Sequence, residues 1–329
     1  MDNYEIKYVD VFTTKPFSGN SAGVITHADG LTVEAMQRIA GEINLSESTF
    51  VTMPESGDSL FRVRFFTPST EYDLSGHALI GTCFALAEEG RIQLRDGRTT
   101  VSVETNVGNI PVDFFFSEDK SQGKPEKSVD RARLTGRNSG YLDKIMMFQT
   151  ILDHYDADIE VSTIAGTLGI DPGAISRTGL PLEVISSGLK QLLVPIDQND
   201  TLKNLNPDMI KLKLMSDRTG VQTIDMFTLD ALDQDCLTYS RHFSPGQGMW
   251  EDPGSGSAAV SIATYLARHG VISDGSHVMQ QGKDLDALSR VLVDIRNEGE
   301  NTDSAWVGGL AVTSIRRRIS IDAGQVMID

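Results

Sequence analysis

One sequence pattern occurs twice, once in each half of the chain. Phe66-Thr67-Pro68 precedes Ser75-Gly76-His77-Ala78, and Phe243-Ser244-Pro245 precedes Ser255-Gly256-Ser257-Ala258. A strand, a loop and a helix opened by glycine are therefore predicted once per half, and such a repeat indicates two related domains. Because helix N-termini attract anions, we expect the two equivalent helix ends to face one cleft.

The length of the chain also favours two domains. Single hydrophobic cores usually stop growing below the 329 residues found here. A polar, lysine-rich stretch over residues 117–130 is the predicted linker. We therefore expect an N-terminal domain over residues 1–120 and a C-terminal domain over 130–316, with the tail 317–329 returning to the first domain.

Local patterns predict more strands than helices, which favours an α+β fold over a doubly wound parallel sheet. Thr32 can cap a helix that ends at Ile43, with its apolar residues at helical spacing. The polar residues 44–48 then predict a loop, which places Glu47 between a helix and a strand. Other predicted helices cover 76–89, 161–168 and 207–215, and other predicted strands cover 6–12, 49–52, 61–65, 101–105, 110–114, 182–185, 191–196, 224–228, 290–295 and 305–314.

The charge of the chain excludes an ordinary nucleic-acid-binding protein. The formal net charge is −17, and the one dense basic run is Arg316-Arg317-Arg318. Nucleic-acid binding needs a basic surface that displaces counterions. A negative overall field also repels anions, so an anionic substrate must be held by local donors such as helix N-termini.

The two cysteines and the chain start point to a reducing compartment. Cys83 and Cys236 are widely separated, which fits neither a metal cluster nor a disulfide framework, so we expect no metal site. Residues 1–7 lack the profile of a signal peptide, and no apolar run is long enough to span a membrane. We expect a cytoplasmic protein that binds neither nucleic acid nor membrane.

Several polar residues lie where they can bind a small anion or move a proton. His77 follows Gly76 at a helix start, where it can contact a substrate anion or satisfy a local backbone group. Gly254, Ser255 and Gly256 can present consecutive backbone donors to a carboxylate. Asp252 before the second helix is suited to an N-cap or to substrate contact. Asn20, in a Gly-Asn pair, is typical of a turn and is a weaker candidate for substrate contact.

Taken together, these motifs resemble the PhzF family of phenazine-biosynthesis-like isomerases. The resemblance runs in family order over nearly the whole chain and is specific as a set. Its motifs are Val9-Asp10-Val11-Phe12-Thr13, Pro16-Phe17-Ser18-Gly19-Asn20, Met36-Gln37 with Ile39-Ala40, Asn44-Leu45-Ser46-Glu47, Phe66-Thr67-Pro68, Gly76-His77-Ala78 and Glu251-Asp252-Pro253-Gly254-Ser255-Gly256-Ser257-Ala258.

The resemblance implies the diaminopimelate epimerase fold, in which two similar α+β domains each wrap a barrel-like sheet around a central helix. It also implies a homodimer and an active site between the domains. It assigns general acid/base catalysis to Glu47, which by itself would more often be an exposed carboxylate or a cap. It further makes His77 and Asp252 catalytic, and Asn20, Ser75, Gly76, Gly254, Ser255, Gly256 and Ser257 substrate-binding residues.

The leading hypothesis is a cofactor-independent isomerase that moves a proton within a small carboxylate-bearing substrate. Two other functions remain open: a racemase or epimerase of an amino-acid-like substrate, and a non-catalytic relative that binds a small molecule. Racemases of this fold that use two thiols carry a cysteine beside each helix start. Neither Cys83 nor Cys236 is in such a position, so a two-thiol mechanism is disfavoured.

Overall fold

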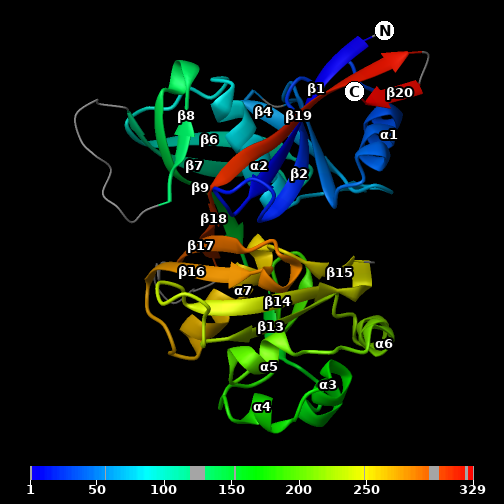
Figure 1. Ribbon diagram of the computed structural model, residues 1–329, viewed down its shortest axis with the longest axis vertical. Helices are drawn as coiled ribbons and strands as arrows, with labels where there is room; N and C mark the ends of the chain where they lie inside the picture. Colours follow the sequence, from blue (N-terminus) through cyan, green and yellow to red (C-terminus); the bar gives the residue numbers. More distant parts are fainter. Residues whose placement is uncertain are drawn as a thin grey trace. The chain divides into compact units, whose positions relative to one another are not determined.

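The chain forms two compact units, which Figure 1 shows as ribbons. This computed structural model describes residues 2–55, 57–118, 130–151, 153–247, 249–295, 304–322 and 325–328. Unit 1 consists of Met1–Met147 and Gly308–Asp329, and unit 2 of Phe148–Val307. Residues 119–129, which hold most of the predicted linker, lie outside the described residues.

Unit 1 is a mostly antiparallel sheet. Its strands follow the order β20-β19-β1-β2-β3-β4-β6-β7-β9-β8, with β5 on β4. The pairs β2–β3 and β4–β6 are parallel. The strands are β1 (Asp2–Val11), β2 (Asn20–Ile25), β3 (Glu47–Thr52), β4 (Phe61–Phe66), β5 (Glu71–Tyr72), β6 (Gly97–Thr105), β7 (Gly108–Glu118), β8 (Ala132–Leu134), β9 (Gly140–Thr150), β19 (Ala311–Asp322) and β20 (Gln325–Ile328). A short 3-10 turn, η1 (Gly136–Asn138), joins β8 to β9.

Two helices pack on this sheet. Helix α2 (Gly76–Glu88) contacts β1, β2, β3, β4 and β19, and every residue from His77 to Ala87 is buried. A helix that is apolar all round is stable only when it is enclosed. Helix α1 (Val33–Ile43) is amphipathic, and it buries the predicted face of Met36, Ile39, Ala40 and Ile43. Thr32 caps it as predicted, with Oγ1 accepting a hydrogen bond from the Ala35 amide at 3.2 Å.

Unit 2 has the sheet order β10-β11-β12-β13-β14-β16-β17, with β15 on β14. Helix α7 (Gly256–Arg268) contacts β11, β12, β13 and β17. The strands are β10 (Asp153–Asp156), β11 (Glu183–Ser186), β12 (Lys190–Pro195), β13 (Thr223–Thr228), β14 (Thr238–Ser244), β15 (Met249–Asp252), β16 (Gly275–Gln281), β17 (Ser289–Ile295) and β18 (Ser304–Gly309), the last of which leads into unit 1. The remaining elements are α3 (Val161–Leu168), α4 (Gly173–Ser176), α5 (Asn199–Lys203), α6 (Met209–Thr219), η2 (Pro245–Gln247) and η3 (Lys283–Leu285).

The sequence repeat corresponds to a repeat of topology. In unit 1, β2 pairs in parallel with β3, β3 antiparallel with β4, and β4 in parallel with β6 across the central α2. In unit 2, the strands β12, β13, β14 and β16 repeat this order of pairings around α7. The repeated motifs thus mark the same strand end and the same helix start in each unit.

The structure differs from the sequence-based expectations at several places. Glu47 begins β3 instead of lying in a loop, because its backbone pairs with Ala22 of β2. Residues 130–147 and 308–316, which the sequence predicts in the C-terminal domain, belong to unit 1, since β8 and β9 extend the sheet beyond β7 and β19 pairs with β1. The predicted strand over 305–314 is divided at Leu310, whose carbonyl accepts a hydrogen bond from the Phe12 amide. The tail pairs with β1 through β19.

A buried side chain holds the C-terminal end of α2, and its loss should destabilise the protein. Asn138 is 4% exposed, and its Nδ2 donates hydrogen bonds of 2.7 Å to the carbonyls of Ala87 and Ile92, while Oδ1 accepts one from the Leu94 amide. Because Asn138→Ala leaves buried backbone groups unpaired, we expect it to lower the free energy of unfolding by about 3 kcal/mol. Asn106→Ala, which changes an exposed asparagine, should cost less than about 1 kcal/mol in the same urea titration.

Candidate active site

The strongest candidate for proton transfer is a carboxylate and imidazole pair in unit 1. Glu47 Oε2 lies 3.3 Å from His77 Nε2, and the two side chains are 15% and 6% exposed. Both atoms are buried, and among the described residues neither has a hydrogen-bond partner. Buried polar atoms are normally satisfied, and exceptions call for an explanation such as a catalytic role. These two atoms therefore mark the pair as the candidate site.

The fold brings these two residues together from distant positions in the sequence. Glu47 is the first residue of β3, beside Ala22 of β2. His77 lies in the first turn of α2, which packs on both of these strands. Gly81, one turn further along α2, lies so close to β1 that a Cβ atom there would be 3.0 Å from Val11 Cγ2. This close approach places the N-terminus of α2 at the end of the sheet where β3 begins.

The other predicted site residues of unit 1 lie at the same end. Ser75 is the N-cap residue of α2, but its side chain makes no cap hydrogen bond, and its Oγ lies 3.4 Å from His77 Nδ1. Asn20 is 3% exposed and begins β2, opposite Val11 of β1. The structure therefore groups Asn20, Glu47, Ser75, Gly76 and His77 at one end of unit 1.

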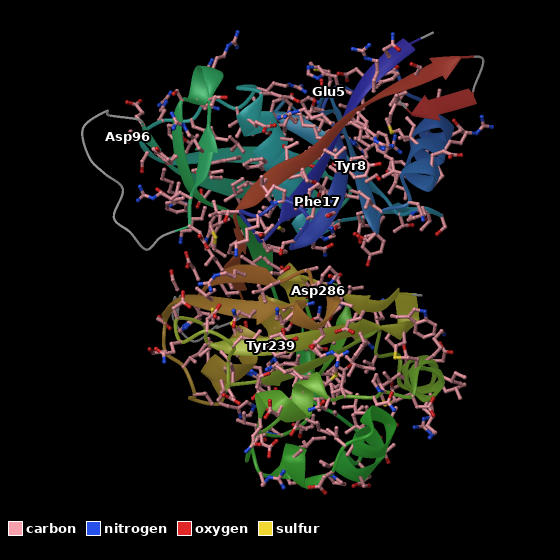
Figure 2. All side chains as sticks on the ribbon, in the orientation of Figure 1. Glu5, Tyr8, Phe17, Asp96, Tyr239 and Asp286 are labelled. Atoms are coloured by element: carbon pink, nitrogen blue, oxygen red, sulfur yellow. The ribbon has the colours of Figure 1, made fainter. Side chains whose placement is uncertain are left out.

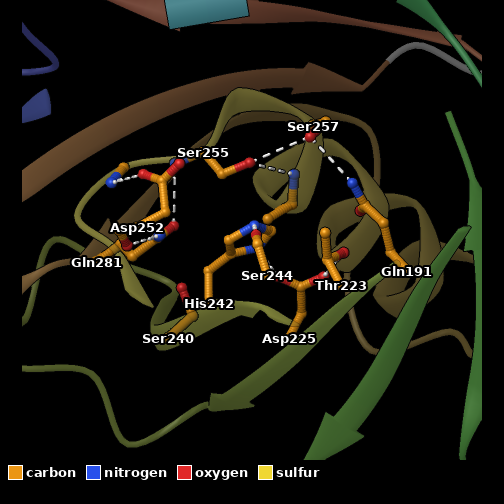
Figure 3. Close-up of polar contacts among 12 residues, drawn as sticks. Gln191, Thr223, Asp225, Ser240, His242, Ser244, Asp252, Ser255, Ser257 and Gln281 are labelled. Carbon is orange, nitrogen blue, oxygen red and sulfur yellow. Dashed lines mark hydrogen bonds and ion pairs between the residues drawn. The ribbon is translucent and has the colours of Figure 1, made fainter. Parts of the chain in front are cut away.

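The predicted residues of unit 2 form a loop at the start of α7, drawn in Figure 3. Asp252 ends β15, and its Oδ1 accepts a 2.8 Å hydrogen bond from the Gly254 amide. Ser255 is the N-cap: its Oγ accepts a hydrogen bond from the Ala258 amide and lies 3.1 Å from Ser257 Oγ. The N-cap role considered for Asp252 therefore belongs to Ser255, and Asp252 stabilises the preceding turn.

Two glutamines that the sequence analysis did not single out fix this loop. Gln281 donates to the carbonyl of Asp252 at 2.6 Å and accepts from the Ser255 amide at 3.2 Å. Gln191 is fully buried, and its Nε2 donates to Ser257 Oγ at 3.0 Å. Since Ser257 accepts this bond, its own hydroxyl proton is available to Ser255 or to a ligand. Both glutamines stand out because a polar amide side chain is buried within a strand. The sequence alone does not show this burial.

Asp225, His242 and Ser244 form a buried polar cluster on the sheet beneath the α7 loop, as Figure 3 shows. Asp225 and His242 are directly opposite each other in β13 and β14, and His242 is opposite Asp252 in β15. His242 Nδ1 bonds to Asp225 Oδ1, and Nε2 lies 2.8 Å from Ser244 Oγ. All three side chains are at most 4% exposed, so this arrangement supports the interior of unit 2.

The equivalent positions of the two units carry different chemistry. Ser48 is opposite Phe66 in unit 1, as Ile224 is opposite Phe243 in unit 2, so Glu47 corresponds to Thr223. The motif alignment likewise matches His77 with Ser257. The ionisable pair of unit 1 is therefore replaced in unit 2 by two hydroxyl groups.

Outside this site, both cysteines have raised thiol pKa values, and the carboxylates beside Cys236 form ion pairs. Cys83 is buried inside α2, and burial raises the pKa of its thiol to about 12. Burial also raises the pKa of the Cys236 thiol to about 12. Among the described residues, Asp233, Asp235 and Cys236 converge as a metal site would require, but Arg290 forms ion pairs with both carboxylates.

Comparison with known proteins identifies the family. The family model described as phenazine biosynthesis-like protein (PhzC-PhzF) matches residues 9–317. The chain belongs to this family. It is 32% identical over 315 residues to the trans-2,3-dihydro-3-hydroxyanthranilate isomerase of Pseudomonas fluorescens, covering 95% of this chain and 97% of that protein. The enzyme of the same name from Pseudomonas aeruginosa is 30% identical, over 92% of this chain and 94% of that protein.

Solved structures agree with the family and confirm the predicted fold. A PhzF-family protein from Bacillus anthracis matches with a TM-score of 0.81 and 27% identity, over 98% of this chain and all of that one. A probable proline racemase from Agrobacterium radiobacter matches with a TM-score of 0.63 and 15% identity, over 97% of this chain and 93% of that one, which shows a shared fold alone. The chain thus has the predicted α+β fold of the diaminopimelate epimerase type.

Several sequence-based expectations stay predictions. In the described part of the chain, no helix combines the length and apolar character needed to cross a membrane. The cytoplasmic location, the homodimer and the anionic substrate stay predictions. The same holds for the expectation that the residues of the two units serve one substrate.

Titration of His242 should appear as a pH-dependent stability of unit 2. Burial opposes protonation of the ring, but the charge and hydrogen bond of Asp225, together with the charges of Asp252 and Glu251, raise the pKa of His242. A raised pKa in the folded state stabilises the fold below the unfolded-state pKa of about 6.5, and this stabilisation is lost as pH rises through the folded-state pKa. The stability difference between wild type and His242→Gln should therefore be larger at pH 6 than at pH 9.

Tryptophan fluorescence during urea unfolding can measure this difference, because Trp250 and Trp306 both belong to unit 2. His154→Gln, which changes an exposed histidine of the same unit, should show no such pH dependence. An equal stability difference at both pH values would contradict the assigned protonation of His242.

Proposed function

We propose that this protein is a cofactor-independent isomerase that moves a proton within a small carboxylate-bearing molecule, with Glu47 as the general acid/base. The observation that carries this proposal is the Glu47–His77 pair: Glu47 Oε2 and His77 Nε2 are buried and lie 3.3 Å apart, and neither of these two atoms has a hydrogen-bond partner among the described residues. Unpaired buried polar groups are tolerated mainly where function requires them. The isomerase names of the Pseudomonas relatives support the same reaction class.

In the proposed reaction, the Glu47 carboxylate takes a proton from a carbon next to a double bond or a carboxyl group. The double bond shifts, and Glu47 returns the proton to another carbon of the same molecule, so no atom is gained or lost. His77, 3.3 Å from Glu47, is positioned to stabilise the charge that develops and to orient the carboxyl group.

The proposal assigns substrate contacts to the α7 loop. The hydroxyl groups of Ser255 and Ser257 lie at a helix N-terminus, where the helix dipole favours a carboxylate. The Gly254 and Ser255 amides, which the sequence suggests as carboxylate donors, instead bond to Asp252 and Gln281. Gln191 leaves the Ser257 proton available by donating to its oxygen. Asp252, fixed by the Gly254 amide and by Gln281, is suited to a polar group of the substrate.

The first molecule to test is trans-2,3-dihydro-3-hydroxyanthranilate, the compound in the names of the two Pseudomonas relatives. It carries a carboxylate and a ring with mobile double bonds, which the proposed chemistry requires. Turnover in deuterated water, followed by NMR, should insert deuterium at one ring carbon. Loss of optical rotation with exchange at a single carbon would instead favour a racemase, and binding without exchange would favour a non-catalytic protein.

Glu47→Gln should abolish this reaction while leaving the fold intact. The change keeps the shape of the side chain and removes its ability to take a proton, and a general acid/base contributes about 10²- to 10⁴-fold to a rate. Deuterium incorporation should fall by at least about 10²-fold, with an unchanged circular dichroism spectrum. Glu55→Gln is the matched control, because Glu55 is an exposed carboxylate beyond the other end of β3. Full activity in Glu47→Gln would contradict the assignment.

Removal of both thiols should leave the reaction in place. A thiol with a pKa of about 12 is almost entirely protonated at neutral pH, which makes Cys83 and Cys236 poor bases. The variant Cys83→Ala/Cys236→Ala should keep kcat within about threefold of wild type, well inside the effect of losing a general base. Loss of exchange in a folded double variant would point to thiol chemistry and against Glu47 as the sole base.

A further inference from the structure

The loop between β1 and β2 holds a large aromatic residue in an unfavourable backbone conformation. Phe12, Phe17 and Gly19 all have left-handed backbone, with φ of 65°, 65° and 69°. Glycine is required at position 19, because a Cβ atom there would lie 2.2 Å from the Val11 carbonyl oxygen. A bulky residue such as Phe17 is rarely found in this region, since its Cβ clashes with the backbone.

A buried carboxylate holds Phe17 in place. Asp10 is 1% exposed, and its Oδ2 accepts a 2.6 Å hydrogen bond from the Phe17 amide. Its Oδ1 accepts a hydrogen bond from the Ser21 hydroxyl. Burial of a carboxylate is unfavourable unless hydrogen bonds compensate, and both bonds here fix the ends of this loop. The conformation of Phe17 is therefore maintained by a dedicated interaction from the core.

The ring that this loop presents is largely exposed among the described residues. Phe17 is 74% exposed, whereas Phe12 in the same loop is 1% exposed. Backbone strain persists only where the surroundings enforce it, and it gathers at functional sites. A single exposed aromatic ring is ordinary by itself, so what sets Phe17 apart is its strained and anchored backbone together with the place where the loop lies.

Strand register places this loop beside the Glu47–His77 pair. Glu47 is next to Ala22, which is opposite Val9, and the loop begins two residues further along β1, after Val11. Helix α2 runs back along β1: Gly81 lies against Val9 and Val11, while Glu88 forms an ion pair with Lys7. His77, one turn before Gly81, is thus at the loop end of β1. In Figure 2, the labels Glu5 and Tyr8 mark the course of β1, and Phe17 lies beyond its end.

We propose that Phe17 is a specificity-determining residue that packs against the flat, apolar ring of the substrate while Glu47 acts on it. This inference rests on the proposed function and adds to it one residue that contacts the substrate. A rigid aromatic side chain presents a large apolar face at a low entropy cost, and stacking against a second ring adds to the gain from burial. Asp10 fixes the backbone that carries the ring before the substrate arrives, which lowers the cost of binding.

The test separates substrate contact from fold stability. Phe17→Asn replaces the ring with a residue that tolerates left-handed backbone, so the melting temperature should stay the same or rise. Its KM for trans-2,3-dihydro-3-hydroxyanthranilate should rise about tenfold, with kcat within about threefold of wild type. The Kd of the planar, unreactive acid 3-hydroxyanthranilate, measured by calorimetry, should rise by a similar factor. Phe17→Tyr, which keeps an aromatic ring, should leave KM and Kd near their wild-type values.

Met53→Asn is the matched control, because Met53 is 72% exposed and follows β3 at its opposite end. It should change neither KM nor Kd. If wild type isomerises the substrate and Phe17→Asn leaves both constants unchanged, the inference is wrong and the proposed function stands. If wild type binds 3-hydroxyanthranilate through Phe17 without turnover, the ring contact stands and the isomerase fails. A wild type that neither binds 3-hydroxyanthranilate nor isomerises the substrate contradicts the inference and the proposed function. If Phe17→Asn changes the molecular mass measured by sedimentation and leaves Kd unchanged, the ring belongs to a subunit contact and the inference is wrong.

Discussion

The enclosure of one helix by a sheet is the constraint on which each unit depends. In α2 every residue from His77 to Ala87 is buried, so the helix has no face that water can cover. Strands from both sides must therefore surround it, and small residues such as Gly81 allow β1 to approach closely. This packing fixes the position of the helix start, because Asn138 and the Lys7–Glu88 ion pair hold the other end. His77 reaches Glu47 as a consequence of core packing, without any local sequence relationship.

The repeat of topology makes the difference between the two units informative. Both have a parallel strand pair, an antiparallel neighbour and an enclosed helix, and both place two side chains at the same strand and helix starts. In unit 1 these side chains are a carboxylate and an imidazole, Glu47 and His77; in unit 2 they are two hydroxyl groups, Thr223 and Ser257. This difference supports the proposal that Glu47 is the single acid/base group.

Buried polar side chains do much of the positioning around these sites. Asp10 holds the loop of Phe17, Gln191 and Gln281 hold the α7 loop, and Asp225 holds His242. Each of these groups is desolvated, so each favours one arrangement of its neighbours strongly over others that would leave it unpaired. The chain thus uses its interior polar groups to fix loops whose outer residues remain available to a ligand.

The sequence by itself determined the α+β class, the division into two related units, the cap and buried face of α1, and the family to which the chain belongs. These features depend on local periodicity and on motifs that repeat in order, which are visible in one dimension. Only the tertiary structure decided that Glu47 begins a strand, that residues 130–147 extend the first sheet, and that Ser255 instead of Asp252 caps α7. Strand pairing and hydrogen-bond geometry join residues far apart in the chain, so no local pattern could predict that Glu47 meets His77, with neither facing atom hydrogen-bonded to another described residue.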